Sequence, residues 1–103
     1  MQSNVSQPLE KRIGCISATM RVIGQKWTAL ILRDMSTGPK RFCDLSRSIS
    51  DINPRTLSAR LEQLREQGII DDCRDESGYY LTKKGQDLIP VLKAMADWGE
   101  SWS

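Results

Sequence analysis

The stretch that decides the fold runs from Pro39 to Gly68 and reads PKRFCDLSRSISDINPRTLSARLEQLREQG. Its second half predicts a helix, because Asn53 is a good N-cap, Pro54 suits the first helical position, and Gly68 supplies a C-terminal stop. Leucines recur every three or four residues between these signals and give that helix one buried side. A shorter helix, about 43–49, precedes it, so the stretch has the layout of a helix-turn-helix DNA-binding motif.

The segments before this motif are predicted to support it. Residues 1–8 are polar, end in a proline and predict a flexible tail. Apolar residues then recur at helical spacing up to about Gly24. The run KWTALILRDM, from Lys26 to Met35, is apolar on more than one side and therefore predicts a buried central helix. The segment Lys40–Phe42 is too short for its pattern to predict a strand.

The segments after the motif predict a wing and a last helix. Two short extended runs flank a turn at Asp75–Gly78, which predicts a small β-hairpin over residues 69–81. Thr82 can cap a final helix over residues 82–102, in which Pro90 either produces a kink or marks a later start.

This order of elements predicts a mainly α fold with a small β-hairpin, which is a winged helix-turn-helix. The chain has 103 residues, enough for one domain, expected over residues 9–103 with the helix-turn-helix at 41–68. The net charge of +2 gives little support for nucleic-acid binding, but the positive excess lies in the first two thirds and the last third is acidic. That asymmetry favours a basic binding face. If the charge distribution were the only observation, an unevenly charged solvated surface would explain it equally well.

The exposed side of the second helix carries the predicted base contacts. Arg55 can pair with guanine through two hydrogen bonds, and Thr56 or Ser58 can bond a base or a phosphate. Ala59 is small enough to allow a close approach or to touch a thymine methyl group. A single surface arginine is more often solvated than bound to DNA, so the helix-turn-helix context carries this prediction. Arg60 is assigned to a backbone phosphate, as are Lys40, Arg41 and Arg47, which precede the second helix, and Arg74 is placed at the wing tip. The complete predicted DNA-binding set is Lys40, Arg41, Arg47, Asn53, Arg55, Thr56, Ser58, Ala59, Arg60 and Arg74.

Several runs resemble the HxlR-type winged-helix transcriptional regulators, a family related to the MarR-type regulators. IGQKWTALILRD at 23–34 resembles the signature I-G-x-K-W-T-x-L-I-L, and INPRTLSARL at 52–61 resembles I-S-x-K-x-L-S-x-R-L. GPKRF at 38–42, YLTKKG at 80–85 and the closing Trp98-Gly99 also match in order, so the resemblance covers about residues 13–102. It implies a homodimeric prokaryotic regulator that binds an inverted repeat of double-stranded DNA and pairs through its terminal helices. The function expected is a sequence-specific repressor that covers a promoter element and responds to an unknown effector.

Three departures from the family pattern change what is expected of this chain. Many members carry a Cys-Pro pair before the first helix, and in some that cysteine senses oxidants, whereas here Cys15 is followed by Ile16. A packed, inert thiol is therefore preferred for Cys15 over redox sensing. Cys43 stands where the family often has Ser or Asn as an N-cap and is a poorer cap. The wing is short, which predicts a reduced or missing groove contact.

Apolar stripes on the first and last predicted helices are wider than a small core can cover, which predicts a two-fold dimer. The dimerisation set comprises Ile13, Ile16, Met20, Ile23, Leu88, Val91, Leu92, Met95, Trp98 and Trp102.

Other functional classes find little support in the sequence. No apolar run is long enough to span a membrane, and no secretory signal is visible. Three widely spaced cysteines and no histidine predict no metal site or cofactor, and reduced thiols favour a cytoplasmic location. An enzyme is not expected, because there is no histidine, phosphate-binding loop or paired-carboxylate cleft. The remaining alternative is a winged helix used for protein–protein contact, which the acidic tail and the low net charge favour slightly.

Overall fold

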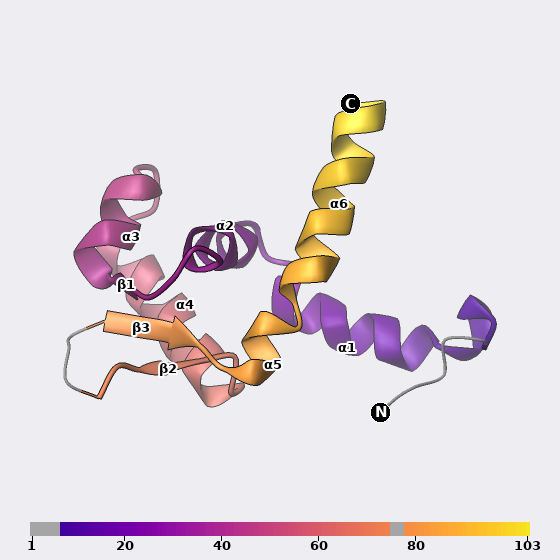
Figure 1. Ribbon diagram of the computed structural model, residues 1–103, viewed down its shortest axis with the longest axis horizontal. Helices are drawn as coiled ribbons and strands as arrows, with labels where there is room; N and C mark the ends of the chain where they lie inside the picture. The colour runs from indigo at the N-terminus through magenta and orange to yellow at the C-terminus, as the bar shows by residue number, and fades with distance from the viewer. Residues whose placement is uncertain (1–6, 75–77) are drawn as a thin grey trace.

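The computed structural model describes residues 7–74 and 78–103 of the chain. The elements in chain order are η1 (Leu9–Lys11), α1 (Ile13–Ile23), α2 (Lys26–Met35), β1 (Lys40–Arg41), α3 (Phe42–Ser48), α4 (Pro54–Glu66), β2 (Ile70–Asp72), β3 (Gly78–Leu81), α5 (Lys83–Gln86) and α6 (Ile89–Trp102). Helices predominate beside one small sheet, which confirms the predicted winged helix-turn-helix fold (Figure 1). Most of the predicted N-terminal tail, and the predicted wing turn, lie outside the described residues.

The helix-turn-helix consists of α3 and α4, and the predicted signals act as expected in α4. The Asn53 Oδ1 accepts a hydrogen bond from the Thr56 N–H at 2.8 Å, and Pro54 is the first helical residue. Gly68 has a φ of 76°, in the left-handed region that favours glycine, so the chain can turn into the wing there. The Ile69 N–H then donates to the Leu64 carbonyl at 2.9 Å, which ties the start of the wing to the end of α4.

The N-terminus of α3 differs from the prediction. Its N-cap residue is Arg41 and its first residue is Phe42, so Cys43 does not occupy a capping position. The Arg41 N–H donates to Asp44 Oδ2 at 3.0 Å, which satisfies a backbone group at the helix start. The expectation of a cap weakened by Cys43 is therefore wrong.

The wing belongs to a three-stranded antiparallel sheet in the order β1-β3-β2. The predicted hairpin is confirmed as β2 and β3, with Asp72 opposite Tyr79. Lys40 and Arg41 form a further strand, because β3 offers them an antiparallel partner in which Arg41 lies opposite Gly78. The pattern of so short a segment did not predict this strand, because its hydrogen-bonding partner is distant in the chain. A Cβ at Gly78 would lie 3.1 Å from the Lys40 carbonyl oxygen, so a glycine fits this close strand pairing.

The single helix predicted over residues 82–102 is divided into α5 and α6. Thr82 caps only α5, where its Oγ1 accepts a hydrogen bond from the Gly85 N–H at 3.2 Å. Pro90 is the second residue of α6, a position at which no helical N–H is needed. The late-start interpretation of Pro90 is therefore confirmed, and no kink has to be invoked.

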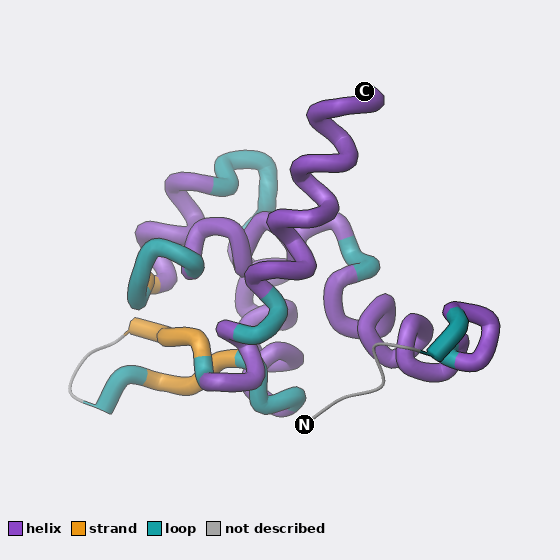
Figure 2. Tube along the Cα trace, turned by 45° about the vertical axis from the view of Figure 1, so that its right-hand side comes forward, coloured by secondary structure: helices purple, strands orange, loops and turns teal. Residues whose placement is uncertain are grey.

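The core is centred on α2, whose Ile31 and Leu32 are fully buried. This confirms the prediction of a central buried helix. Leu57, Leu61 and Leu64 of α4 pack into the same core. Away from this body, α6 and the N-terminal part of α1 project in different directions, as both views show (Figures 1 and 2).

Candidate nucleic-acid interface

The first two turns of α4 expose most of the predicted base-contacting side chains. Arg55, Ser58 and Ala59 are exposed, and Thr56 is half-buried. At 100° per residue, Arg55 and Ala59 lie on the side of the helix opposite its buried leucines. Because the N-terminal end of such a helix is the part that enters a major groove, these side chains can reach base edges. The side-chain oxygen of Asn53 is engaged in the helix cap, so a contact of this residue with DNA would fall to its amide nitrogen.

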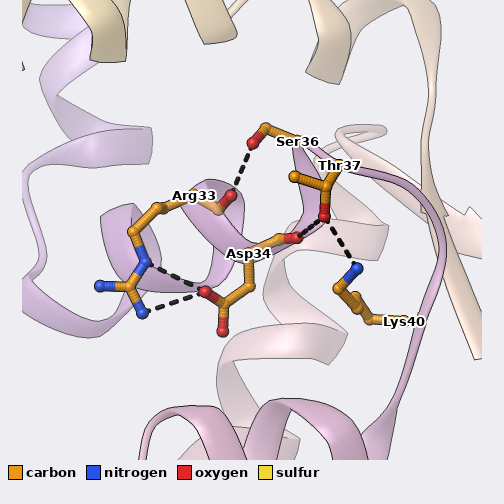
Figure 3. A network of polar contacts seen from close by, with 5 residues as sticks. All are labelled: Arg33, Asp34, Ser36, Thr37 and Lys40. Carbon is orange, nitrogen blue, oxygen red and sulfur yellow. Dashed lines mark hydrogen bonds and ion pairs between the residues drawn. The ribbon is translucent and has the colours of Figure 1, made fainter.

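Lys40 belongs to a polar network at the end of α2 (Figure 3). Its Nζ donates to the Thr37 Oγ1 at 2.9 Å, and that hydroxyl donates to the Asp34 carbonyl oxygen at 3.2 Å. The Ser36 Oγ likewise donates to the Arg33 carbonyl at 2.7 Å. These contacts satisfy carbonyls that a helix C-terminus leaves free, and the ammonium lies where the helix dipole favours positive charge.

Arg41 and Arg47 both face the carboxylate of Asp44 at the start of α3. The Arg47 Nη2 lies 3.2 Å from Asp44 Oδ1, and the Arg41 Nε lies 3.7 Å from Asp44 Oδ2. The Arg41 backbone N–H, followed by the charges of Arg41 and Arg47, holds the pKa of Asp44 below its usual value. Both arginines are exposed, so they can turn toward phosphates at the expense of weak surface pairs.

The two remaining predicted phosphate contacts lie on other segments of the chain. Arg60 of α4 is half-buried, and its Nε has no hydrogen-bond partner within the described residues. Arg74 is exposed and follows β2, next to the undescribed wing turn.

One feature of the site was not predicted from the sequence. Arg65 of α4 contacts Glu62 of the same helix through its Nη2 at 2.9 Å, and Asp72 of β2 through its Nη1 at 2.8 Å. The hydrogen bond and charge of Glu62, and then the charge of Asp72, raise the pKa of Arg65. The spacing of Glu62 and Arg65 hints at their pairing, but nothing local in the sequence points to Asp72.

The terminal helices carry most of the large exposed apolar side chains. On α6 these are Val91, Met95, Trp98 and Trp102, and on α1 they are Ile13, Ile16 and Met20. The four α6 residues lie within about 60° of one another around the helix, so they form one face. Leu88 and Leu92 are half-buried against the core.

Ile23 does not belong to this exposed surface. It is only 5% exposed and lies in the core, because the end of α1 packs against α2. Its assignment to the dimer surface is therefore wrong.

The cysteines differ in exposure. Cys15 on α1 and Cys43 on α3 are exposed, and Cys73 is half-buried. The preferred interpretation of Cys15 as a packed thiol is therefore wrong. Over residues 7–74 and 78–103, no cluster of three potential metal ligands occurs. In the same part of the chain, no helix is long and apolar enough to cross a membrane.

Known proteins resemble this chain in both sequence and fold. The family model for HxlR-like helix-turn-helix proteins matches residues 22–103. An HTH-type transcriptional regulator of Methanothermobacter thermautotrophicus is 32% identical over 92 residues, which cover 84% of this chain and 70% of that protein. A Mycobacterium tuberculosis regulator of the same type is 34% identical, and there the match spans 58% of the longer protein.

Among solved structures, quinone-bound YodB from Bacillus subtilis superposes with a TM-score of 0.79 at 28% identity, covering 86% of this chain and 99% of that one. The redox regulator HypR in its reduced form gives a TM-score of 0.78 at 33% identity, covering 84% and 90% of the two chains. A MarR-family protein of Enterococcus faecalis, at 23% identity, shares the fold with a TM-score of 0.78 over 99% of this chain and 94% of its own. With its winged helix-turn-helix and the family match over most of its length, the chain belongs to the HxlR-like helix-turn-helix family of transcriptional regulators.

Proposed function

We propose that this protein binds an inverted-repeat operator as a dimer and represses transcription by occupying it. The observation that carries the proposal is the arrangement of α4, which buries its leucines and exposes Arg55, Ser58 and Ala59 at its N-terminal end. Arg55 offers a planar fork that matches the acceptors of guanine, and Ala59 leaves room for the groove wall. Lys40, Arg41, Arg47, Arg60 and Arg74 are the proposed phosphate contacts.

A dimer supplies what one copy of α4 lacks. One recognition helix reads few base pairs, whereas a two-fold dimer places two such helices in successive major grooves about 34 Å apart. The exposed face of α6, together with the exposed residues of α1, is the proposed dimer surface. The operator should therefore consist of two half-sites separated by about one helical turn.

Selection of bound DNA from a random pool tests this function. The wild-type protein should recover an inverted repeat, and its affinity should fall steeply with salt. Arg55→Ala should lose about 1–3 kcal/mol of discrimination at one base position of each half-site. Lys93→Ala is the control, because it also removes one positive charge. Lys93 is exposed on α6, on the side opposite the proposed dimer face, and is not a proposed DNA contact. If Arg55→Ala binds the selected operator with unchanged affinity and discrimination, Arg55 does not read bases.

The acidic C-terminal third favours one alternative function, a winged helix that binds another protein. In that case the wild-type protein would select no DNA sequence, and no salt-dependent complex with DNA would form. The selection experiment therefore separates the two functions without a further assay.

The exposure of Cys15 favours thiol control as a second property. Cys15 lies on α1, the helix that carries Ile13 and Met20 of the proposed dimer surface, but at 100° per residue it faces away from these two side chains. Its oxidation would place a polar or bulky group on the other side of that helix, where it would alter how α1 packs. Mild oxidation should then reduce operator binding by the wild-type protein and by Cys43→Ser, but not by Cys15→Ser. Equal sensitivity of the wild-type protein and Cys15→Ser would exclude this role.

A further inference from the structure

The three-residue cluster of Glu62, Arg65 and Asp72 joins α4 to the wing. The two terminal nitrogens of Arg65 divide between the carboxylates, at 2.9 Å from Glu62 and 2.8 Å from Asp72. Arg65–Asp72 is the one salt bridge, within the described residues, between side chains more than four positions apart in the chain. It therefore links two elements, whereas the other pairs act within one helix or across one helix start.

The cluster lies directly beside the proposed base-contacting residues. Ser58 and Arg65 are seven residues apart and so lie on the same side of α4. Together with Leu61, Glu62, Asp72 and Tyr79, they line one hollow of about 270 Å³ between α4 and the wing. Asp72 is paired with Tyr79 of β3 across the sheet, so a force on Asp72 reaches both strands of the wing.

The two ends of β2 are fixed to α4 in different ways. At its start, the Ile69 N–H bonds the Leu64 carbonyl, and the Thr82 hydroxyl donates to the Gly68 carbonyl at 2.6 Å. Ile69 and Ile70 are also buried in the core. At its far end, Asp72 is exposed and is tied to α4 through Arg65. The pairing of β1 with β3 at Tyr79 also holds this end of the sheet, and the Arg65–Asp72 salt bridge adds a direct side-chain link between β2 and α4.

We propose that Arg65 is a positioning residue for DNA binding, whose guanidinium holds the wing at a fixed angle to α4. The proposal rests on the DNA-binding function proposed above, and it assigns Arg65 no contact with DNA. In the free and bound protein alike, Arg65 stays paired with Glu62 and Asp72. The wing that it holds presents Arg74 to the DNA flanking each half-site.

Substitution of Asp72 separates this role from simple electrostatics. Asp72→Asn removes a negative charge near the DNA, so charge alone would tighten binding. Loss of the bridge would instead release the wing and weaken binding. Glu66→Gln is the matched control, because it removes the same charge from α4 at an exposed residue that makes no salt bridge within the described part of the chain. The two explanations therefore predict opposite changes in the DNA affinity of Asp72→Asn, so the measured direction decides between them.

The experiment measures affinity for DNA selected by the wild-type protein, together with hydroxyl-radical footprints of each complex. We expect Arg65→Gln and Asp72→Asn each to weaken binding by about fivefold, and the double variant to be no weaker than either single one, since both remove the same contact. Protection of the DNA flanking each half-site should be lost, while protection within the half-site is kept. Glu66→Gln should bind as tightly as the wild-type protein or more tightly.

Three results would overturn the proposal: tighter binding by Asp72→Asn, additive losses in the double variant, or an unchanged footprint in Arg65→Gln. Failure of the proposed function itself looks different, because then the wild-type protein selects no DNA and no variant can be compared.

Discussion

The two tryptophans of α6 give the proposed dimer a test of calculable size. Trp98 is 68% exposed and Trp102 is 76% exposed, and they lie one turn apart on the same face. A tryptophan presents up to about 250 Å², so about 170 Å² of Trp98 remains to be covered. At about 25 cal/mol per Å², covering that area would contribute about 4 kcal/mol per side chain as an upper value.

Truncation of an interfacial tryptophan removes only part of this contribution. Trp98→Ala should cost about 2 kcal/mol per protomer, which is typical of a residue at the centre of an interface. A two-fold dimer contains two copies, so its Kd should rise about 1000-fold, the equivalent of about 4 kcal/mol. This change moves a nanomolar dimer into the micromolar range.

Sedimentation equilibrium over a dilution series measures this Kd directly. Glu100→Ala serves as the control, because residue 100 lies on the opposite side of α6 and is exposed. The control should dimerise like the wild-type protein, and Trp98→Ala should keep its fold as judged by circular dichroism, since residue 98 contributes nothing to the buried core. A folded Trp98→Ala variant with the wild-type Kd would show that this face of α6 is not the dimer surface.

Three further predictions concern the elements that hold the site. Asn53→Ala removes the cap that bonds the Thr56 N–H, so urea unfolding should show a loss of about 1 kcal/mol. Gly85→Ala would place a Cβ in a steric clash with the Ile69 carbonyl oxygen, so the backbone must shift and denaturation should show a loss of at least about 1–3 kcal/mol. Asp44 has a lowered pKa in the folded chain, so its contribution to stability is present above the unfolded-state pKa and is lost as the pH falls through the folded-state value. Asp44→Asn should therefore flatten the acid limb of a stability–pH curve, and an unchanged limb would show that the carboxylate adds nothing.

Sequence reasoning succeeded where the determining interactions are local. Asn53, Pro54 and Gly68 act within one turn of the residues that they cap or terminate, so α4 could be placed from its own sequence. The exposure of Arg55 and Ala59 followed from the same helical periodicity that buries the leucines.

It failed where a distant partner decides the structure. The strand β1 has two residues and exists because β3 supplies its hydrogen bonds. The burial of Ile23 depends on how α1 packs against α2, and an apolar stripe does not distinguish a core contact from a dimer contact. Arg65 and Asp72 are separated by the turn at Gly68, and no periodicity relates residues across such a turn.

The position of α2 connects the proposed dimer surface to the proposed DNA-binding surface. α2 packs against α6 on one side and against α3 and α4 on the other, and its Ile31 and Leu32 are fully buried. A close-packed core transmits a displacement rather than absorbing it, so a change in how two α6 helices meet would alter the separation of the two α4 helices. An effector or a thiol modification would change operator affinity through this connection only if it stabilises one arrangement of the two α6 helices more than another. A ligand shifts an equilibrium between two states only by the difference between its binding free energies to them. The residues to be altered first are therefore those of the exposed α6 face, with operator affinity rather than dimer affinity as the readout.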